Sequence, residues 1–167
     1  VADGLSAAGA ELTGLAPGTP VAVGTGDDFS NLIGSGVTAP GVAAVSLGTA
    51  EVVGTLHDKV VIDPEMLVET HRFLGGNVHL GNPGWLSGGA VRWAAGVLGA
   101  ADDAAFMALA AEAAPGCGGL VFIPALNGAM APKWLAEARG SFVGLTTSHG
   151  RAEMSRAVLE GNAFAMR

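Results

Sequence analysis

Two short groups of residues near the start of the chain have the types and the spacing for phosphoryl transfer. The acidic pair Asp27-Asp28 follows the apolar run Val21–Val23 and a Gly-Thr-Gly turn, where a carboxylate can take a proton from a substrate hydroxyl. About twenty residues later, Gly48-Thr49-Ala50 separates two apolar segments. The backbone N–H groups of such a turn can meet phosphate oxygens. A base and a phosphate cradle at this spacing are typical of a phosphoryl-transfer cleft.

Spacing alone also permits a plainer interpretation, and by itself it favours that one. Gly48-Thr49-Ala50 would then be only a hairpin turn. The acidic pair Asp27-Asp28 would be only a solvated strand end or a helix cap. The choice between the two interpretations depends on the surrounding elements and on family resemblance.

The elements expected around these residues place both groups at the ends of regular structure. A strand over Val21–Thr25 leads to the acidic pair, and a short helix over Ser30–Gly36 follows it. Two apolar strands, Val42–Leu47 and Glu51–Leu56, flank the Gly-Thr-Ala turn. Thr38-Ala39-Pro40-Gly41 breaks the chain before the first of these strands and is the candidate hinge or lobe boundary.

The rest of the chain alternates strands with helices, which indicates an α/β domain. The pattern predicts a helix over Gly88–Leu98 whose inner face carries Trp93, Val97 and Leu98. It also predicts a final helix capped by Ser148, with Met154, Ala157, Val158 and Phe164 facing inward. The other expected elements are a strand pair over His71–Leu80, a helix beginning at Asp102-Asp103 and a buried strand over Gly119–Leu126.

The composition limits the possible partners and locations. A chain of 167 residues, half of them apolar, is long enough for one domain with a sizeable core. Its net charge of −7 repels the phosphate backbone of nucleic acids, so no nucleic-acid partner is expected. The single Cys117 excludes an internal disulfide and suits a reducing, cytoplasmic location. Gly, Pro, Ser and Asn residues interrupt the uncharged stretch Phe29–Ala50, so no membrane partner is expected.

Several common site signatures are absent from the sequence. It contains no GxxxxGK[ST] phosphate loop, no GxGxxG and no GxSxG. The four histidines form no i,i+4 pair and a single cysteine cannot build a zinc site, so no metal-ligating residues are expected. The chain begins at Val1 without an initiator Met and stops at Arg167 within a helical pattern. We therefore expect a piece of a longer protein.

Three collinear segments together resemble the FGGY family of carbohydrate kinases, most closely its xylulose kinase branch. The first is GTGDDFSNLIGSGV, residues 24–37, followed by PGVAAVSLGTAEVV, residues 40–53. It is similar to the family's Gly-Gly-Asp segment and SLGT phosphate hairpin. The second is the small-residue helix start Leu86–Trp93, and the third is Gly140–Arg167, which is similar to the family's C-terminal signature.

The resemblance implies an α/β fold of the actin-like ATPase (ribonuclease H-like) type, with two lobes that hold ATP and sugar between them. Residues 1–38 would close the first lobe, and residues 39–167 would begin the second. By position, Asp27 matches the catalytic base, and Asp27 and Asp28 would contact the sugar. Gly48 and Thr49 match the phosphate-contacting hairpin, and Gly88-Gly89 would lie beside the nucleotide. The implied cofactors are ATP and Mg²⁺.

The resemblance therefore implies an ATP-dependent sugar kinase that transfers the γ-phosphate to a sugar hydroxyl, with D-xylulose as the favoured substrate. Another pentulose, gluconate, a polyol and a non-catalytic sugar-binding role remain alternatives. Xylulose kinases usually have Asn after the catalytic Asp, where this chain has Asp28, so the sugar stays open. The expected partners are the sugar and ATP, and a homodimer is possible. Without the missing lobe segments, the 167-residue chain alone is expected to be inactive.

Overall fold

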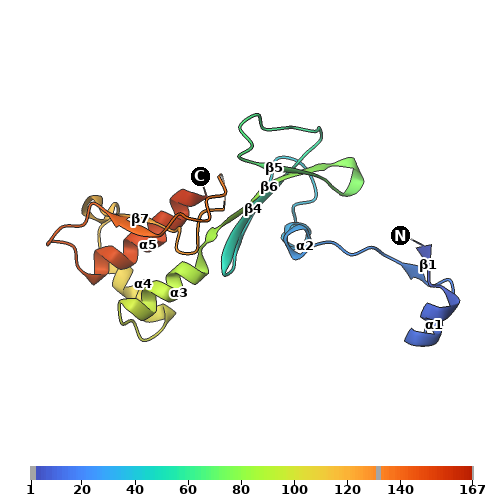
Figure 1. Cartoon of the computed structure of the whole chain (residues 1–167), viewed down its shortest axis with the longest axis horizontal. Helices are drawn as coiled ribbons and strands as arrows, with labels where there is room; N and C mark the ends of the chain where they lie inside the picture. Colours follow the sequence, from blue (N-terminus) through green and yellow to red (C-terminus); the bar gives the residue numbers. More distant parts are fainter. Residues whose placement is uncertain (1–2, 131–132, 167) are drawn as a thin grey trace. The chain divides into compact units, whose positions relative to one another are not determined.

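A computed structural model describes residues 3–130 and 133–166 of the chain (Figure 1). Its contacts divide the chain into two compact units, Val1–Asn31 and Leu32–Arg167. Each unit is described by itself. The lobe boundary predicted between residues 38 and 39 stays a prediction. None of the described helices is long and apolar enough to cross a membrane.

The first unit is a small ββ pair with one helix. Strand β1 (Asp3–Gly4) pairs antiparallel with β2 (Pro20–Val21), and α1 (Ala7–Thr13) lies between them in sequence. Helix α2 (Asp27–Gly34) begins in this unit and crosses into the next.

The predicted strand Val21–Thr25 is wrong beyond Val21, because the residues up to Gly26 have no ladder partner among the described residues. The predicted helix begins three residues earlier than Ser30, at Asp27. Negative charge in the first turn of a helix stabilises its N-terminus, which favours this earlier start. Asp27 and Asp28 therefore lie on a helix rather than at the end of a strand.

The second unit begins with a four-stranded antiparallel sheet of order β3-β4-β6-β5. Its strands are β3 (Ala43–Leu47), β4 (Ala50–His57), β5 (Glu69–Arg72) and β6 (Val78–Leu86). The hairpin predicted around Gly48-Thr49 is confirmed, with Leu47 opposite Glu51. Leu32 of α2 packs with Val37 and Leu56 in a small core against this sheet. A short 3₁₀ turn, η1 (Leu74–Gly76), joins β5 to β6.

The rest of this unit is mainly helical, with a short two-stranded sheet (Figure 1). Its elements are α3 (Gly88–Val97), α4 (Asp103–Glu112), the 3₁₀ turn η2 (Cys117–Gly119), β7 (Val121–Ile123), β8 (Ser141–Val143) and α5 (Arg151–Ala165). Helix α5 packs against α3, α4 and β7. Their shared core includes Phe106, Phe122 and Val158, all at most 2% exposed.

Two side-chain predictions in this region are wrong, and a third holds only in part. Val97 is 64% exposed, because α3 turns its alanines, including the fully buried Ala90, toward the core. Trp93 is 41% exposed, but its ring stacks on the buried Phe122 with 6.2 Å between the ring centroids. Phe164 is 61% exposed near the end of α5. The cap of α5 is Gly150 rather than Ser148, since the Gly150 N–H donates to the Glu153 carboxylate at 2.8 Å.

Candidate functional site

The turn between β3 and β4 is joined to the N-terminus of α3 by three backbone hydrogen bonds. The Gly88 N–H donates to the Gly48 carbonyl at 3.0 Å. The N–H groups of Ser87 and Gly89 both donate to the Thr49 carbonyl, at 3.1 and 3.0 Å. The structure thus brings together all four residues that the sequence assigned to the nucleotide: Gly48, Thr49, Gly88 and Gly89.

Glycine at position 88 allows this close approach of turn and helix. A Cβ on Gly88 would overlap the Gly48 carbonyl oxygen. Backbone contact this close is available only to a residue without a side chain. The close approach of the turn therefore explains why the start of this helix consists of small residues, Ser-Gly-Gly.

These bonds also decide which N–H groups are left for a phosphate. The N–H groups of Gly88 and Gly89 are already engaged, and the Gly48 N–H donates to the Ala50 carbonyl at 2.9 Å. Within residues 3–130 and 133–166, the N–H and hydroxyl of Thr49 form no hydrogen bond, and this residue is exposed. Thr49 is therefore the residue of the turn that offers donors to an anion.

A cavity of about 610 Å³ opens beside this turn. It is lined by Thr49, by Arg92 on α3, by Asp103 on α4 and by Asn162 on α5, among others. Arg92 lies four residues after Gly88, one helical turn along the same face, and supplies positive charge. Asn162 is 5% exposed and donates its amide to the Ser87 carbonyl at 3.2 Å.

Arg92 and Asn162 were missed by sequence reasoning. The position of Arg92, four residues after the helix start, was the available signal. Asn162 had no comparable signal, because its place depends on how α5 packs against the start of α3. In the described part of the chain, the Asn162 side-chain oxygen is buried and has no hydrogen-bond partner.

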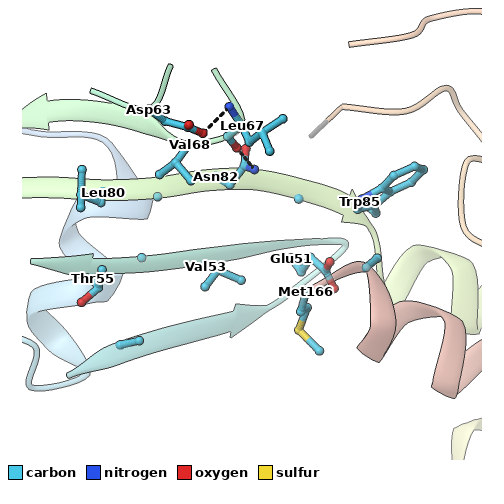
Figure 2. A pocket seen from close by; sticks show the side chains of 15 residues that line it. Glu51, Val53, Thr55, Asp63, Leu67, Val68, Leu80, Asn82, Trp85 and Met166 are labelled. Atoms are coloured by element: carbon cyan, nitrogen blue, oxygen red, sulfur yellow. Dashed lines mark hydrogen bonds between the residues drawn. The ribbon is translucent and has the colours of Figure 1, made fainter. Parts of the chain in front are cut away.

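A buried carboxyl lies directly after the turn. Glu51 in β4 is 1% exposed, and its Oε2 has no partner among the described residues. Burial raises the pKa of Glu51, although hydrogen bonding from the Trp85 backbone and the Ser87 side chain opposes that rise. It lines a second cavity of about 550 Å³ together with Trp85 and Met166 (Figure 2).

The predicted base and its neighbour are placed in the other unit. Asp27 and Asp28 are exposed in the first turn of α2, and both belong to Val1–Asn31. Their catalytic and sugar-binding roles stay predictions. In the part of the chain that the structure describes, no group of three or more His, Cys, Asp or Glu residues could hold a metal ion.

Comparison with known proteins places this arrangement among sugar kinases. A family profile described as "FGGY family of carbohydrate kinases, C-terminal domain" matches residues 43–167. Xylulose kinase from Klebsiella pneumoniae is 35% identical over 90% of this chain and 31% of its own length. Gluconokinase from Bacillus subtilis is 33% identical over 89% of this chain and 31% of its own length.

Structural comparison agrees with the sequence comparison. The crystal structure of ligand-bound xylulose kinase from Lactobacillus acidophilus superposes with a TM-score of 0.86 and 32% identity. It covers 95% of this chain and 33% of that one. The chain thus spans about a third of the length of the relatives it matches. Its α/β architecture is part of the actin-like ATPase fold of these kinases.

Proposed function

The chain belongs to the FGGY family of carbohydrate kinases, and we propose that the protein carrying it transfers the γ-phosphate of ATP to a hydroxyl of a sugar. The favoured acceptor is D-xylulose, which would give D-xylulose 5-phosphate. Relatives named for xylulose and for gluconate match at similar identity, so gluconate is the main alternative. Another pentulose or a polyol is the next alternative acceptor.

The observation that carries this proposal is the unengaged Thr49 N–H and hydroxyl beside the 610 Å³ cavity. A phosphate group on ATP would accept hydrogen bonds from both. The α3 N-terminus adds the positive end of a helix dipole, and the Arg92 guanidinium on the same cavity adds a full positive charge. These groups fit an anion despite the net charge of −7.

The remaining roles follow from the family assignment. In phosphoryl transfer, positioning and charge stabilisation supply most of the rate, and a carboxylate orients the attacking hydroxyl. We assign that carboxylate to Asp27 and a sugar contact to Asp28. Mg²⁺ is the metal expected to accompany ATP and to neutralise charge on its phosphates. A cytoplasmic location, where ATP is available, belongs to the same proposal.

The experiment that tests this function is an ATP-dependent phosphorylation assay on the full-length protein. D-xylulose, D-ribulose, gluconate and glycerol are compared at equal concentrations, with ADP release and product mass as readouts. The highest kcat/KM is expected for D-xylulose. A non-catalytic relative would instead bind one of these compounds in calorimetry and release no ADP above the sugar-free background.

The assignment of the base is tested by a matched pair of substitutions. Asp27→Asn keeps the side-chain size but cannot accept the hydroxyl proton, so kcat is expected to fall by roughly 10²- to 10⁴-fold. The sugar KM is expected to change far less. Asp28→Asn is expected to cost less than about tenfold in kcat. A larger loss for Asp28→Asn would show that the base is the second carboxylate of the pair.

A further inference from the structure

One buried amide joins helix α5 to the start of α3. Asn162 of α5 is 5% exposed, and its side-chain amide donates to the Ser87 carbonyl at 3.2 Å. A carbonyl oxygen can only accept, so the NH₂ group of Asn162 must face Ser87 and its side-chain oxygen must face away. That oxygen is buried and finds no hydrogen-bond partner among residues 3–130 and 133–166.

The amide is not needed to satisfy the Ser87 carbonyl. The Val91 N–H also donates to this carbonyl, at 3.1 Å, and so closes the first turn of α3. Ser87 would therefore keep a donor if the Asn162 side chain were removed. Burying the Asn162 oxygen without a partner costs free energy, which offsets what the amide hydrogen bond contributes. A buried polar side chain that adds little to stability calls for another explanation.

Ser87 connects α5 to the turn between β3 and β4. Its N–H donates to the Thr49 carbonyl at 3.1 Å, while its carbonyl accepts from Asn162. Helix α5 is held firmly at this level, because a Cβ on Gly161 would overlap the Phe122 carbonyl oxygen, so the helix backbone lies directly against β7. A closely packed helix is thus linked to the turn through one residue of the α3 start.

We propose that Asn162 is a positioning residue: its amide holds the Ser87 carbonyl and so keeps the turn where Thr49 can meet the phosphates of the nucleotide. This role rests on the proposed kinase function. Asn162 lies in the wall of the same cavity of about 610 Å³. It acts on the phosphates through the backbone of Ser87 and Thr49 and does not bind them itself.

The first test removes the amide in two ways in the full-length protein. Asn162→Ala and Asn162→Leu both lack the donor but differ in volume. In both, the loss of one hydrogen bond is expected to raise the ATP KM about fivefold. The sugar KM is expected to change less than about twofold. An increase in only one of the variants would make the volume the cause, and equal increases in both KM values would mean a general loss of structure. Either result would overturn the proposal.

Stability separates this role from a merely structural one, with Asn82 as the matched control. Asn82 of β6 makes the same kind of bond, from its side-chain amide to the Leu67 carbonyl at 2.7 Å, and lines the other cavity. Asn82→Ala is expected to lower the midpoint of urea unfolding and to leave the ATP KM unchanged. Asn162→Ala should do the reverse and shift the midpoint by less than about 0.5 M. The same pattern in both variants would refute the proposal.

A readout without catalysis separates failure of this proposal from failure of the proposed function. Hydrogen–deuterium exchange is followed on peptides that cover residues 86–93, whose first N–H groups bond to the turn. Exchange there is expected to be about fivefold faster in Asn162→Ala than in wild type or Asn82→Ala. Unchanged exchange would refute the positioning role, whether or not any sugar is phosphorylated. Unchanged exchange together with a raised ATP KM would make Asn162 a direct contact of the nucleotide instead.

Discussion

The fold shifts the pKa values of two carboxyl groups, Glu160 and Glu51, in opposite directions. At the α4–α5 junction (Gly116, Cys117, Arg156 and Glu160), Glu160 accepts from Arg156 Nε at 2.7 Å and from the Gly116 N–H at 3.1 Å. Burial raises the pKa of Glu160, but these hydrogen bonds outweigh it and the pKa lies below its usual value.

At the β4–α3 junction (Thr49, Glu51, Ser87 and Gly88), the balance is reversed. Among the described residues, Glu51 has no salt-bridge partner and one carboxyl oxygen without a hydrogen bond. Desolvation dominates, and the pKa of Glu51 is raised. A satisfied carboxylate beside an arginine stabilises a fold, whereas a buried carboxyl left partly unsatisfied is more often associated with a site. The two junctions should therefore respond differently to substitution.

The largest effect is expected from a substitution at the β4–α3 junction. Gly88→Ala places a Cβ on the Gly48 carbonyl, so the helix start must move away from the turn. Three backbone hydrogen bonds would be weakened, each worth about 1 kcal/mol, and the ATP KM is expected to rise about a hundredfold. Steady-state kinetics of the full-length protein with ATP as the varied substrate measures this.

The same helix supplies a control for Gly88→Ala. Gly96 lies in the last turn of α3, and a Cβ there would meet open space. Gly96→Ala should therefore raise the unfolding free energy by up to about 1 kcal/mol through helix propensity. Its ATP KM is expected to equal that of wild type. If Gly88→Ala also kept wild-type ATP kinetics, the close approach of Gly88 to the turn would have no part in nucleotide binding.

A smaller effect of a different kind is expected at the α4–α5 junction. Glu160→Ala leaves the Arg156 Nε and the Gly116 N–H without their acceptor, while another guanidinium nitrogen of Arg156 still donates to the Ala113 carbonyl. The unfolding free energy is expected to fall by about 2 kcal/mol, and the ATP KM by contrast to stay within about twofold of wild type. Urea unfolding monitored by circular dichroism measures the first quantity.

Glu112→Ala is the matched control for that substitution. Glu112 ends α4 and is exposed, so its removal is expected to change the unfolding free energy by less than about 0.5 kcal/mol. A change in ATP KM for Glu160→Ala as large as that for Gly88→Ala would remove the distinction between the two junctions.

The parts of the fold that the sequence predicted well are those with local causes. The two strands around Gly48-Thr49 were predicted to within one or two residues, because alternating apolar residues and a small-residue turn act over short distances. The helix beginning at Asp102-Asp103 was also correct, since the Asp102 side chain caps it by accepting from the Ala105 N–H at 2.8 Å.

The parts that failed depend on distant segments. Val97 faces outward because the alanines of α3 pack toward the core that α5 shares. An acidic residue after a turn, such as Glu51, would be expected to be exposed. The burial of Glu51 depends on the distant strand β6, whose pairing with β4 shifts register at this position. Gly84 of β6 has no side chain, which leaves space for the side chain of Glu51. The candidate site was thus predictable in its turn and helix start, but not in the carboxyl behind them.

The smallest expected effect concerns how the unfolding free energy depends on pH. Glu160 and Glu51 are expected to contribute to this dependence with opposite signs. For Glu160 the folded pKa lies below the ordinary glutamate value of 4.5, so the unfolded chain binds more protons in the interval between them. Its contribution to stability is complete above about pH 4.5 and is lost as the pH falls through the folded pKa. For Glu51 the folded pKa lies above 4.5, so the folded chain binds more protons there.

The contribution of Glu51 is therefore complete below about pH 4.5 and is lost as the pH rises through the folded pKa. Relative to wild type, Glu160→Gln should show a shallower fall in unfolding free energy on acidification below that pH. Glu51→Gln should instead show a shallower fall, or a steeper rise, as the pH increases above it, because Gln cannot ionise. Urea unfolding of the three proteins at half-unit steps between about pH 3 and pH 8 compares these slopes. If both variants change the pH dependence of the unfolding free energy in the same direction, the Glu51 carboxyl has a cationic partner in the full-length protein. The pKa of Glu51 would then be lowered, as that of Glu160 is.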